Sequence, residues 1–414
     1  MTTTTDALQQ VRKAGRRVAI LETEQKNACL RRLAEDLRQA LPEILEANAM
    51  DLEAAAEAGV NGPKLDRLRL DAAKIEAMAA GVEQVAGLPD PVLAETVNRT
   101  LDNGLQVRRV RTPIGVIMMI YEARPNVTVD AFALCFKSGN ACILKGGKEA
   151  SRSNTKLRDL IVAALTRDGL PAEAITLITG SDREELKELL RRDDVIDLVI
   201  PRGGEPLIRF VHEHSRIPTV QHFHGVCHLF VDASADLEQA LDVCVNAKTS
   251  APATCNSAEA VLVHLEIAPV FIPALCERMA AAGVEVRGDA ATVQLAPGTR
   301  PATDADWGTE FLDRIVAVRV VDDLDGAIEH IERFGSDHTE VILTRDPNHA
   351  ERFTREVQAS CTLVNASTRF NDGFQLGLGA EIGISTSKVH AFGPMGLEEL
   401  TVQRYVVQGN GHTR

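Results

Sequence analysis

The sequence feature that most constrains the fold is an alternation of apolar runs and helical segments that begins at Thr112. Residues 115–121 are continuously apolar, which is typical of a strand buried on both faces of a sheet. Residues 126–137 have a helical pattern, Gly139 stands where such a helix would end, and residues 141–145 form the next expected strand. This alternation predicts a parallel sheet with helices on both faces, whose ligands would bind beyond the carboxyl ends of the strands.

The alternation continues along the chain and then starts again. In the first set we expect helices at 151–167 and 184–191 and strands at 174–178 and 196–200. In a second set, from about residue 227 to 365, we expect strands at 228–231, 258–264 and 315–321 and helices at 237–248 and 325–333. Residues 7–87, which precede both sets, have the apolar spacing of helices. The sequence therefore predicts an α/β protein with two doubly wound α/β domains.

A hairpin and a late strand lie outside the two α/β sets. Residues 97–111 are predicted to form the hairpin, with Asp102-Asn103-Gly104 as its turn, and residues 401–407 form a β-branched strand. Bare strand edges invite aggregation, so both segments favour pairing with another copy of the chain. We expect an oligomerisation arm and a homodimer or larger homo-oligomer; a purely structural role within the subunit is the alternative.

The composition argues against several classes of protein. The net charge of -14 does not suit nucleic acid as the main partner, because phosphate backbones require a basic face. The eight cysteines are scattered without a C-x-x-C pair, which indicates reduced thiols rather than disulfides or zinc ligands. No stretch approaches the roughly 20 apolar residues of a membrane span, and residues 1–6 show no signal peptide. We therefore expect a cytoplasmic protein that does not bind membranes.

A polar loop at residues 246–257 lies between a predicted helix and a predicted strand and contains Cys255. Thr254 and Asn256 flank this cysteine, whereas a structural cysteine prefers an apolar setting. A nucleophilic cysteine needs access and a polar, electropositive environment, and Lys248 is the nearest cation in the sequence. Cys255 is therefore a candidate nucleophile, with an inert loop thiol as the alternative.

Four motifs give the chain a resemblance to a known family: Tyr121-Glu-Ala-Arg-Pro-Asn126, Ile200-Pro-Arg-Gly-Gly204, Asn246-Ala-Lys248 with Thr254-Cys-Asn256, and His390-Ala-Phe-Gly-Pro-Met-Gly-Leu397. On these motifs, and over nearly its whole length, the chain resembles the aldehyde dehydrogenase superfamily. The resemblance implies that superfamily's α/β fold with an oligomerisation arm. It assigns residues 1–226 to a cofactor-binding domain, residues 227–365 to the catalytic cysteine domain, and residues 366–414 to a return into the cofactor domain and the oligomerisation strand.

The resemblance also gives two residues catalytic roles. It implies that Cys255 attacks the acyl carbon of the substrate. It further implies that the Asn126 amide and the Cys255 backbone N–H donate to the oxyanion that develops in the transition state. From its position alone, Asn126 follows Pro125 at the start of a helix and would be the N-cap. The two roles of Asn126 use different atoms, so both can hold.

Six residues match the cofactor site of the superfamily: Lys145, Lys148, Arg202, Gly203, Gly204 and Glu310. Lys145 would contact the adenosine ribose, and Lys148 stands where members that use NAD often carry a glutamate. A cation there suits a 2′-phosphate, so the resemblance implies NADPH; a surface lysine is the alternative. The Gly-Gly pair before a helix would take the pyrophosphate, and Glu310 would hold the nicotinamide ribose unless it is a solvated helix carboxylate. No metal is expected.

One absence indicates the branch of the superfamily. Hydrolytic members carry a glutamate that activates water, whereas the matching stretch here, Val220–Val226, contains His222 and His224 but no carboxylate. This fits the phosphate-dependent branch, which starts from an acyl phosphate, because phosphate leaves and no water is needed. The resemblance further implies that this acyl phosphate is glutamate 5-phosphate and that the reaction belongs to proline biosynthesis. The alternatives are a hydrolytic aldehyde dehydrogenase, with a histidine as base, and a non-catalytic nucleotide-binding paralogue.

The substrate implied by the resemblance carries anionic ends. Arg124, Lys248 and the turn at Asn371 are the candidates to bind them, and the sequence does not rank the three. Phe392 stands where we expect an arginine in the last family motif, so no substrate role is carried over to that loop. The one protein partner that the resemblance suggests is the upstream glutamate kinase.

Overall fold

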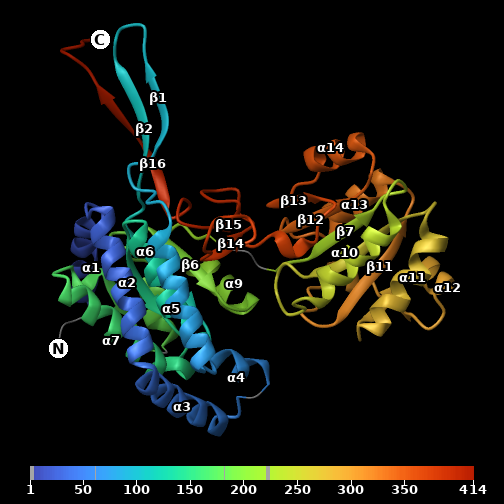
Figure 1. Cartoon of the computed structure of the whole chain (residues 1–414), viewed down its shortest axis with the longest axis horizontal. Helices are drawn as coiled ribbons and strands as arrows, with labels where there is room; N and C mark the ends of the chain where they lie inside the picture. The colour runs from blue at the N-terminus through green and yellow to red at the C-terminus, as the bar shows by residue number, and fades with distance from the viewer. Residues whose placement is uncertain (1–3, 61, 181, 221–223) are drawn as a thin grey trace. The chain divides into compact units, whose positions relative to one another are not determined.

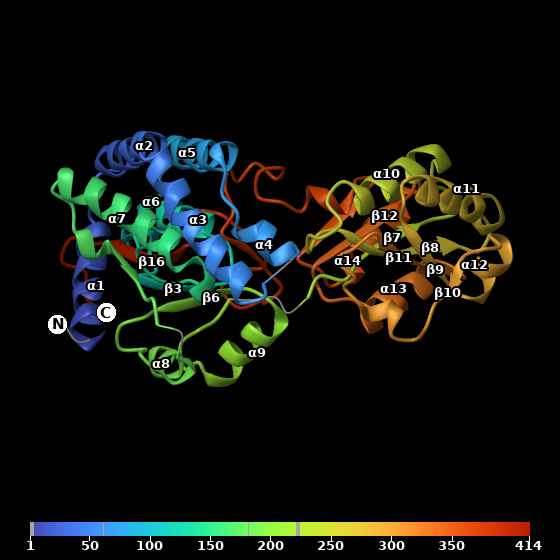
Figure 2. The same cartoon turned by 90° about the horizontal axis from the view of Figure 1, so that it is seen from below.

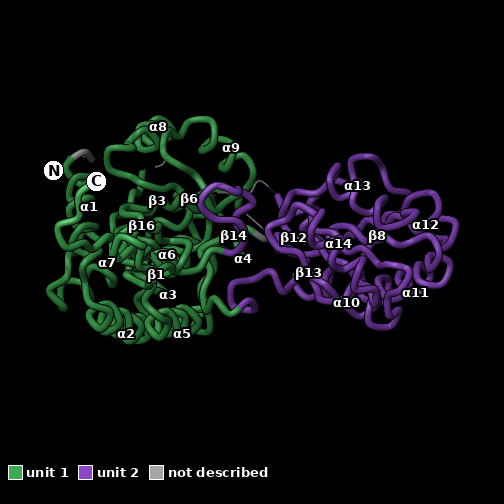
Figure 3. The backbone as a smooth tube through the Cα atoms, turned by 90° about the horizontal axis from the view of Figure 1, so that it is seen from above, with its two compact units in different colours: residues 1–221, 377–383, 395–414 green, residues 222–376, 384–394 purple. Residues whose placement is uncertain are grey.

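The structure is a computed structural model that describes residues 4–60, 62–180, 182–220 and 224–414. The chain divides into two compact units, which Figure 3 shows in two colours. Unit 1 comprises residues 1–221, 377–383 and 395–414, and unit 2 comprises residues 222–376 and 384–394. Residues 366–376 and 384–394, which we expected to return to the first domain, group with unit 2.

Unit 1 contains a parallel sheet with the strand order β5-β4-β3-β6. Its strands are β3 (Val116–Tyr121), β4 (Ala141–Lys145), β5 (Ile175–Leu177) and β6 (Leu198–Arg202). All residues of β3 and β4 are buried, as expected for apolar strands of a parallel sheet. The parallel sheet predicted from the alternating pattern is confirmed.

In the part of the chain that the structure describes, unit 1 also contains nine α-helices. They are α1 (Thr4–Val18), α2 (Thr23–Gln39), α3 (Leu41–Glu57), α4 (Pro63–Leu68), α5 (Ala72–Gly87), α6 (Asn126–Lys137), α7 (Ser151–Arg167), α8 (Arg183–Leu189) and α9 (Glu205–His214), with the 3-10 helices η1 (Lys148–Ala150) and η2 (Ala172–Ala174). Of the nine, α1, α6, α7, α8 and α9 pack against the sheet and the others pack on helices. Leu8 of α1 and Leu189 of α8 share an apolar cluster with Met118 of the sheet. Helices α2 and α5 run side by side (Figure 2). The segment predicted as helical over residues 7–87 is thus divided into separate helices, α1 to α5.

A separate antiparallel sheet extends from unit 1 as a ribbon (Figure 1). It consists of β1 (Glu95–Thr100), β2 (Gln106–Pro113) and β16 (Thr401–Gln408), with β2 in the centre. The predicted hairpin and the predicted final strand are confirmed, and they pair with each other in one chain. β1 is exposed along its whole length, and so are Tyr405 and Val407 of β16. We call this sheet the arm.

Unit 2 contains a second parallel sheet, with the strand order β10-β9-β11-β8-β7-β12-β13. Its strands are β7 (Cys227–Val231), β8 (Ala258–His264), β9 (Glu285–Gly288), β10 (Arg300–Pro301), β11 (Ile315–Val321), β12 (Thr339–Leu343) and β13 (Cys361–Val364). Its helices are α10 (Leu237–Thr249), α11 (Ala268–Ala281), α12 (Ala290–Leu295), α13 (Leu324–Phe334) and α14 (Pro347–Glu356), with the 3-10 helices η3 (Asp306–Gly308) and η4 (Thr368–Phe370). The predicted second α/β set is confirmed.

Alternate residues of the unit 2 strands point to two apolar layers. Leu229 and Val231 of β7 share a cluster with Phe271 of α11. Phe230, which lies between them in β7, shares a different cluster with Phe353 of α14. Because successive side chains of a strand point to opposite faces, helices cover both faces of this sheet, as in a doubly wound fold.

The glycine-rich segment near the end of the chain contains a two-stranded ribbon, β14 (Gly383–Ser385) and β15 (Gly393–Met395). None of the eight cysteines forms a disulfide. In the described part of the chain, no helix combines the length and the apolar character needed to cross a lipid bilayer.

Candidate functional site

The ends of three strands bring predicted site residues of unit 1 to one edge of its sheet. β3 lies between β4 and β6, with Ile120 paired to Lys145 and Tyr121 paired to Arg202. The three strands are parallel, so Lys145, Arg202 and the loop 122–126 all lie at the carboxyl edge. Open α/β sheets bind their ligands at this edge.

Asn126 is the first residue of α6, and Pro125 is the N-cap. Its Nδ2 donates a hydrogen bond of 2.9 Å to Oδ2 of Asp130, one turn further along the helix. The interpretation of Asn126 as the N-cap is therefore wrong. The bond to Asp130 leaves the second N–H of the amide for another acceptor. Burial raises the pKa of the Asp130 carboxyl to about 6, and Arg124 is exposed in the loop before the helix.

The two predicted cofactor lysines differ in environment. Lys145 is buried, and its Nζ donates to the backbone oxygen of Gly180, in the loop that follows β5. Burial lowers the pKa of this ammonium group. Lys148, the first residue of η1, is exposed. The ammonium of Lys145 is thus fixed at the carboxyl edge, whereas that of Lys148 lies in solvent.

The Gly-Gly pair lies where α9 begins. Gly204 is the N-cap of α9, and its N–H donates to Oε2 of Glu122 at 3.2 Å. A carboxylate thus occupies the position at a helix start that favours an anion. A Cβ on Gly203 would lie 2.7 Å from Leu207 Cδ2 and 2.9 Å from Glu122 Cδ. The absence of a side chain at Gly203 is what lets the loop and the Glu122 side chain approach so closely.

In unit 2, Cys255 is half-buried in a turn between α10 and β8. Since β8 begins just after this turn, Cys255 lies at the amino edge of its sheet, not at the carboxyl edge where we expected ligands. The Cys227 thiol donates to the Cys255 carbonyl oxygen at 3.2 Å, and burial raises the pKa of Cys227. Gly225 lies against the same backbone, because a Cβ there would be 2.2 Å from the Cys255 carbonyl oxygen.

Two residues from late in the sequence hold the Cys255 turn. Arg369 Nη1 donates to Thr254 Oγ1 at 2.8 Å, and Asn256 Nδ2 donates to the Asn371 carbonyl oxygen at 2.9 Å. The Asn371 side chain is fully buried and donates to a threonine of β12. Asn371, a predicted substrate ligand, therefore supports the turn from inside unit 2. We did not predict Arg369 or Gly225, since their contacts with the turn join residues far apart in the sequence.

Lys248, the second predicted substrate ligand, lies inside the protein. Its Nζ is 2.8 Å from Oε2 of Glu259, and both side chains are 0% exposed. Burial raises the pKa of Glu259 to about 7 and lowers the pKa of Lys248. The ammonium group is therefore bound to a buried carboxyl and has no exposed surface for a substrate.

Glu310 is half-buried in the irregular segment between η3 and β11, so its interpretation as a solvated helix carboxylate is wrong. Its charge contributes to the raised pKa of Glu259, which places it on the same side of unit 2 as the buried ion pair. His224, the other described candidate base, is half-buried next to Gly225. His222 lies outside the described residues.

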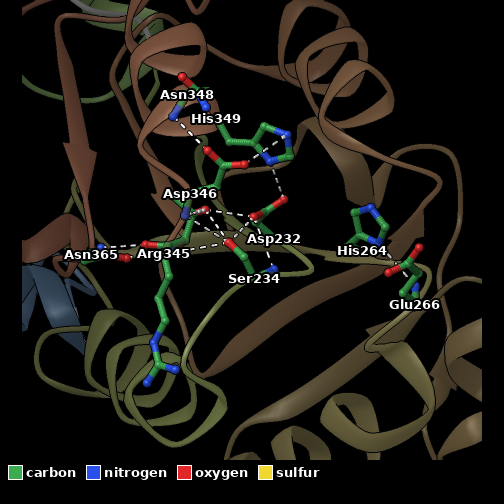
Figure 4. Close-up of polar contacts among 10 residues, drawn as sticks. Asp232, Ser234, His264, Glu266, Arg345, Asp346, Asn348, His349 and Asn365 are labelled. Atoms are coloured by element: carbon green, nitrogen blue, oxygen red, sulfur yellow. Dashed lines mark hydrogen bonds and ion pairs between the residues drawn. The ribbon is translucent and has the colours of Figure 1, made fainter.

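A different polar cluster occupies the carboxyl edge of the unit 2 sheet (Figure 4). The buried Asp232 carboxylate accepts from Ser234 Oγ at 2.6 Å and from Thr344 Oγ1 at 2.7 Å, and His349 Nδ1 lies 2.9 Å from its second oxygen. Burial opposes the charge on Asp232, but these hydrogen bonds outweigh it and lower the pKa. Its acceptors are satisfied within the protein, which indicates a structural cluster. Across the described ranges, no group of three or more acidic, histidine or cysteine side chains is placed to hold a metal ion.

Comparison with known proteins gives the class of this chain. The model of the aldehyde dehydrogenase family matches residues 2–306, and the chain belongs to this family. It is therefore an oxidoreductase, and members of the family use a nicotinamide cofactor.

Three proteins that are similar to this chain over nearly its whole length have the same name. A gamma-glutamyl phosphate reductase from Xylella fastidiosa is 52% identical over 98% of both chains. A protein of the same name from Xanthomonas oryzae pv. oryzae is 51% identical over 100% of both. The crystal structure of gamma-glutamyl phosphate reductase from Thermotoga maritima has a TM-score of 0.97 and 45% identity, covering 99% of each chain. The aldehyde dehydrogenase-like fold predicted from the sequence is confirmed.

Proposed function

We propose that this chain reduces L-glutamate 5-phosphate to L-glutamate 5-semialdehyde with NADPH, as a step of proline biosynthesis. The observation that carries the proposal is the 52% identity, over 98% of both chains, to a gamma-glutamyl phosphate reductase. The lack of a carboxylate in Val220–Val226 supports it, because a reductase that acts on an acyl phosphate needs no base to activate water.

Cys255 supplies the nucleophile in this mechanism. Its thiolate adds to the acyl carbon, the bond from that carbon to the phosphate oxygen breaks, and a thioester and inorganic phosphate result. Hydride addition to the thioester carbon gives a thiohemiacetal oxyanion. Its collapse breaks the C–S bond, releases the aldehyde and restores the thiolate. The Cys255 N–H and the remaining N–H of Asn126 are the donors that we assign to the oxyanion.

NADPH supplies the hydride when it is bound, and the residues of the chain fit such a dinucleotide. The fixed ammonium of Lys145 can donate to a ribose hydroxyl, and the amides of Gly203 and Gly204, beside Arg202, can take the pyrophosphate. The Gly204 N–H already binds a carboxylate oxygen, which supports an anion at this helix start. Lys148 would contact the 2′-phosphate, and Glu310 the nicotinamide ribose.

The test is the reverse reaction, in which NADP+ oxidises glutamate semialdehyde with and without inorganic phosphate. We expect phosphate to be required beyond the first turnover, because the thioester has no other efficient acceptor. Without phosphate, the NADPH formed should equal the enzyme concentration. Cys255→Ser should give no burst yet still bind NADPH, since serine is a poor nucleophile without an adjacent base. Steady turnover without phosphate would identify a hydrolytic dehydrogenase with His222 or His224 as base.

We also propose that the arm joins copies of the chain into a homodimer or larger homo-oligomer. Its edge strands β1 and β16 expose unpaired backbone groups, which form a template for pairing with another strand. Acyl phosphates are labile, so the upstream glutamate kinase is the protein partner whose contact with this enzyme we would test first.

A further inference from the structure

We propose that Arg369 binds the phosphoryl group of the substrate and the phosphate that leaves it. The proposal rests on the proposed function, because an acyl phosphate places phosphate next to Cys255 and a simple aldehyde does not. Arg369 would then determine specificity for phosphate as the acyl carrier, a role that no sequence motif assigned to any residue.

The course of the chain after β13 carries this arginine to the nucleophile. Asn365 Nδ2 donates to the carbonyl oxygen of Thr344, just beyond the carboxyl end of β12. Six residues later, Asn371 Nδ2 donates to the hydroxyl of Thr339 at the start of the same strand. Residues 365–371 therefore run back from the carboxyl edge of the unit 2 sheet to its amino edge, where the Cys255 turn lies.

Arg369, in the middle of this segment, contacts the residue that adjoins the nucleophile. Its Nη1 donates to Thr254 Oγ1 at 2.8 Å. Its Nε is buried and has no hydrogen-bond acceptor among the described residues. A guanidinium group has five N–H hydrogens, four of them on its two Nη atoms. One of the four donates to Thr254, which leaves three for a ligand beside Cys255.

The charge of Arg369 is not neutralised by a carboxylate. No ion pair joins Arg369 to an acidic side chain in the ranges that the structure describes, whereas Arg345 pairs with Asp236 and Arg352 with Glu356. An arginine without a carboxylate next to a nucleophilic turn suits an anionic ligand. Guanidinium groups bind phosphate through two parallel hydrogen bonds, which gives both affinity and orientation.

The substrate offers two anionic groups, and the position of Arg369 favours the phosphate. The phosphoryl group is attached to the carbon that Cys255 attacks, so it must lie beside the nucleophile. The α-carboxylate lies at the other end of the carbon chain. Lys248, the cation nearest to Cys255 in the sequence, is fully buried against Glu259 and does not compete for this role.

The experiment compares wild-type protein with Arg369→Gln in the reverse reaction, with NADP+, glutamate semialdehyde and inorganic phosphate as the varied reactant. We expect the apparent KM for phosphate to rise by roughly 10- to 100-fold, the effect of losing a charge-assisted hydrogen-bond pair. The KM for the semialdehyde and the amplitude of the phosphate-independent first-turnover burst should change little. Arg369→Lys, which keeps the charge but not the planar fork, should give a smaller increase.

Two control variants separate phosphate binding from support of the turn. Thr254→Val removes the hydroxyl that accepts from Arg369 and that lies within hydrogen-bond distance of Ala251 and Asn256 oxygens, but it keeps the cation. Its KM for phosphate should therefore rise less than that of Arg369→Gln. Arg345→Gln removes an exposed arginine at the carboxyl edge of the same sheet and should leave the KM for phosphate unchanged. The alkylation rate of Cys255 by iodoacetamide in Thr254→Val, followed by mass spectrometry, reports the geometry of the turn at unchanged charge and independently of phosphate.

Three results would overturn the proposal. A raised KM for the semialdehyde with an unchanged KM for phosphate would assign Arg369 to the α-carboxylate. An unchanged KM for phosphate together with slower alkylation in both Arg369→Gln and Thr254→Val would reduce the arginine to a support of Thr254. Wild-type protein that turns over steadily without phosphate would refute the proposed function itself, and this result is seen before any variant is made.

Discussion

Gly225→Ala should disable Cys255, the proposed nucleophile, without unfolding the protein. A Cβ at position 225 would lie 2.2 Å from the carbonyl oxygen of Cys255, 2.9 Å from its carbonyl carbon and 3.1 Å from its Cα. All three are backbone atoms, so no side-chain rotation relieves the overlap. Ordinary contact begins near 3.4 Å, so the turn must withdraw by about 1 Å, a displacement that can cost roughly 100-fold in catalytic rate.

The assay is the phosphate-dependent oxidation of glutamate semialdehyde with NADP+. We expect kcat of Gly225→Ala to fall by about 100-fold, while the affinity for NADPH, measured by fluorescence titration, stays within twofold of wild type. The overlap should also lower the free energy of unfolding by about 1–3 kcal/mol, the usual effect of overpacking. A thermal unfolding curve would show that the variant is folded at the assay temperature.

Gly326→Ala is the matched control, because a Cβ there meets its nearest neighbour, Val321 Cβ, at an ordinary 3.6 Å. It also lies in helix α13, where alanine is more favourable than glycine, so activity and stability should be preserved. If Gly225→Ala retained a kcat within twofold of wild type, the close approach of Gly225 to the Cys255 backbone would not position the nucleophile, and the reasoning would be refuted.

Four further results are expected. Burial raises the pKa of Asp130 to about 6, so the folded state keeps a proton that the unfolded chain releases near pH 4. The free energy of unfolding should therefore fall as the pH rises from about 4 to 6, and urea unfolding of Asp130→Asn should show a flatter dependence of this free energy on pH. Asp232→Asn should lower the free energy of unfolding by about 3 kcal/mol, because it replaces a charged acceptor of several buried hydrogen bonds. Lys148→Glu should shift the NADPH/NADH ratio of kcat/KM toward NADH, and an unchanged ratio would place cofactor specificity elsewhere. Light scattering should show a dimer or larger assembly that Tyr405→Asp weakens, whereas a stable monomeric wild type at micromolar concentration would argue against an oligomerisation arm.

The elements with strong periodicity could be read from the sequence. The helix Ser151–Arg167 and the strand Ala258–His264 have the predicted bounds, because the first has a long apolar stripe at helical spacing and the second is a short, largely apolar run that follows a polar loop. Fewer elements were predicted correctly in the region from Ala268 to Glu356, where α11, β12 and α14 were missed. Helix α11 contains Pro273 in its interior, and β12 is a five-residue strand, so local patterns there were weak.

The site residues divide in the same way. Cys255 and the carboxyl-edge residues of unit 1 follow from motifs and from the rule for parallel sheets, and both kinds of signal are local. The support of the Cys255 turn depends instead on contacts such as Arg369 with Thr254, which are 115 residues apart. Gly225 gave no signal in the sequence either. A side chain at this position is excluded only because β7 and β8 lie side by side in the fold.

Lys248 shows that the cation nearest to Cys255 in the sequence need not lie beside it in the structure. It lies seven residues before Cys255, but it belongs to α10, whose buried face directs its ammonium to Glu259 inside unit 2. A buried cation that is paired with a carboxyl adds little net positive field, because the two charges nearly cancel. Arg369 reaches the same turn from the opposite end of the sequence with no carboxylate partner in the described ranges. Within unit 2, Arg369 rather than Lys248 is therefore the cation that we expect to give Cys255 the electropositive setting that a reactive thiolate requires. The iodoacetamide alkylation of Cys255 should lose part of its rate at neutral pH in Arg369→Gln but retain it in Arg369→Lys.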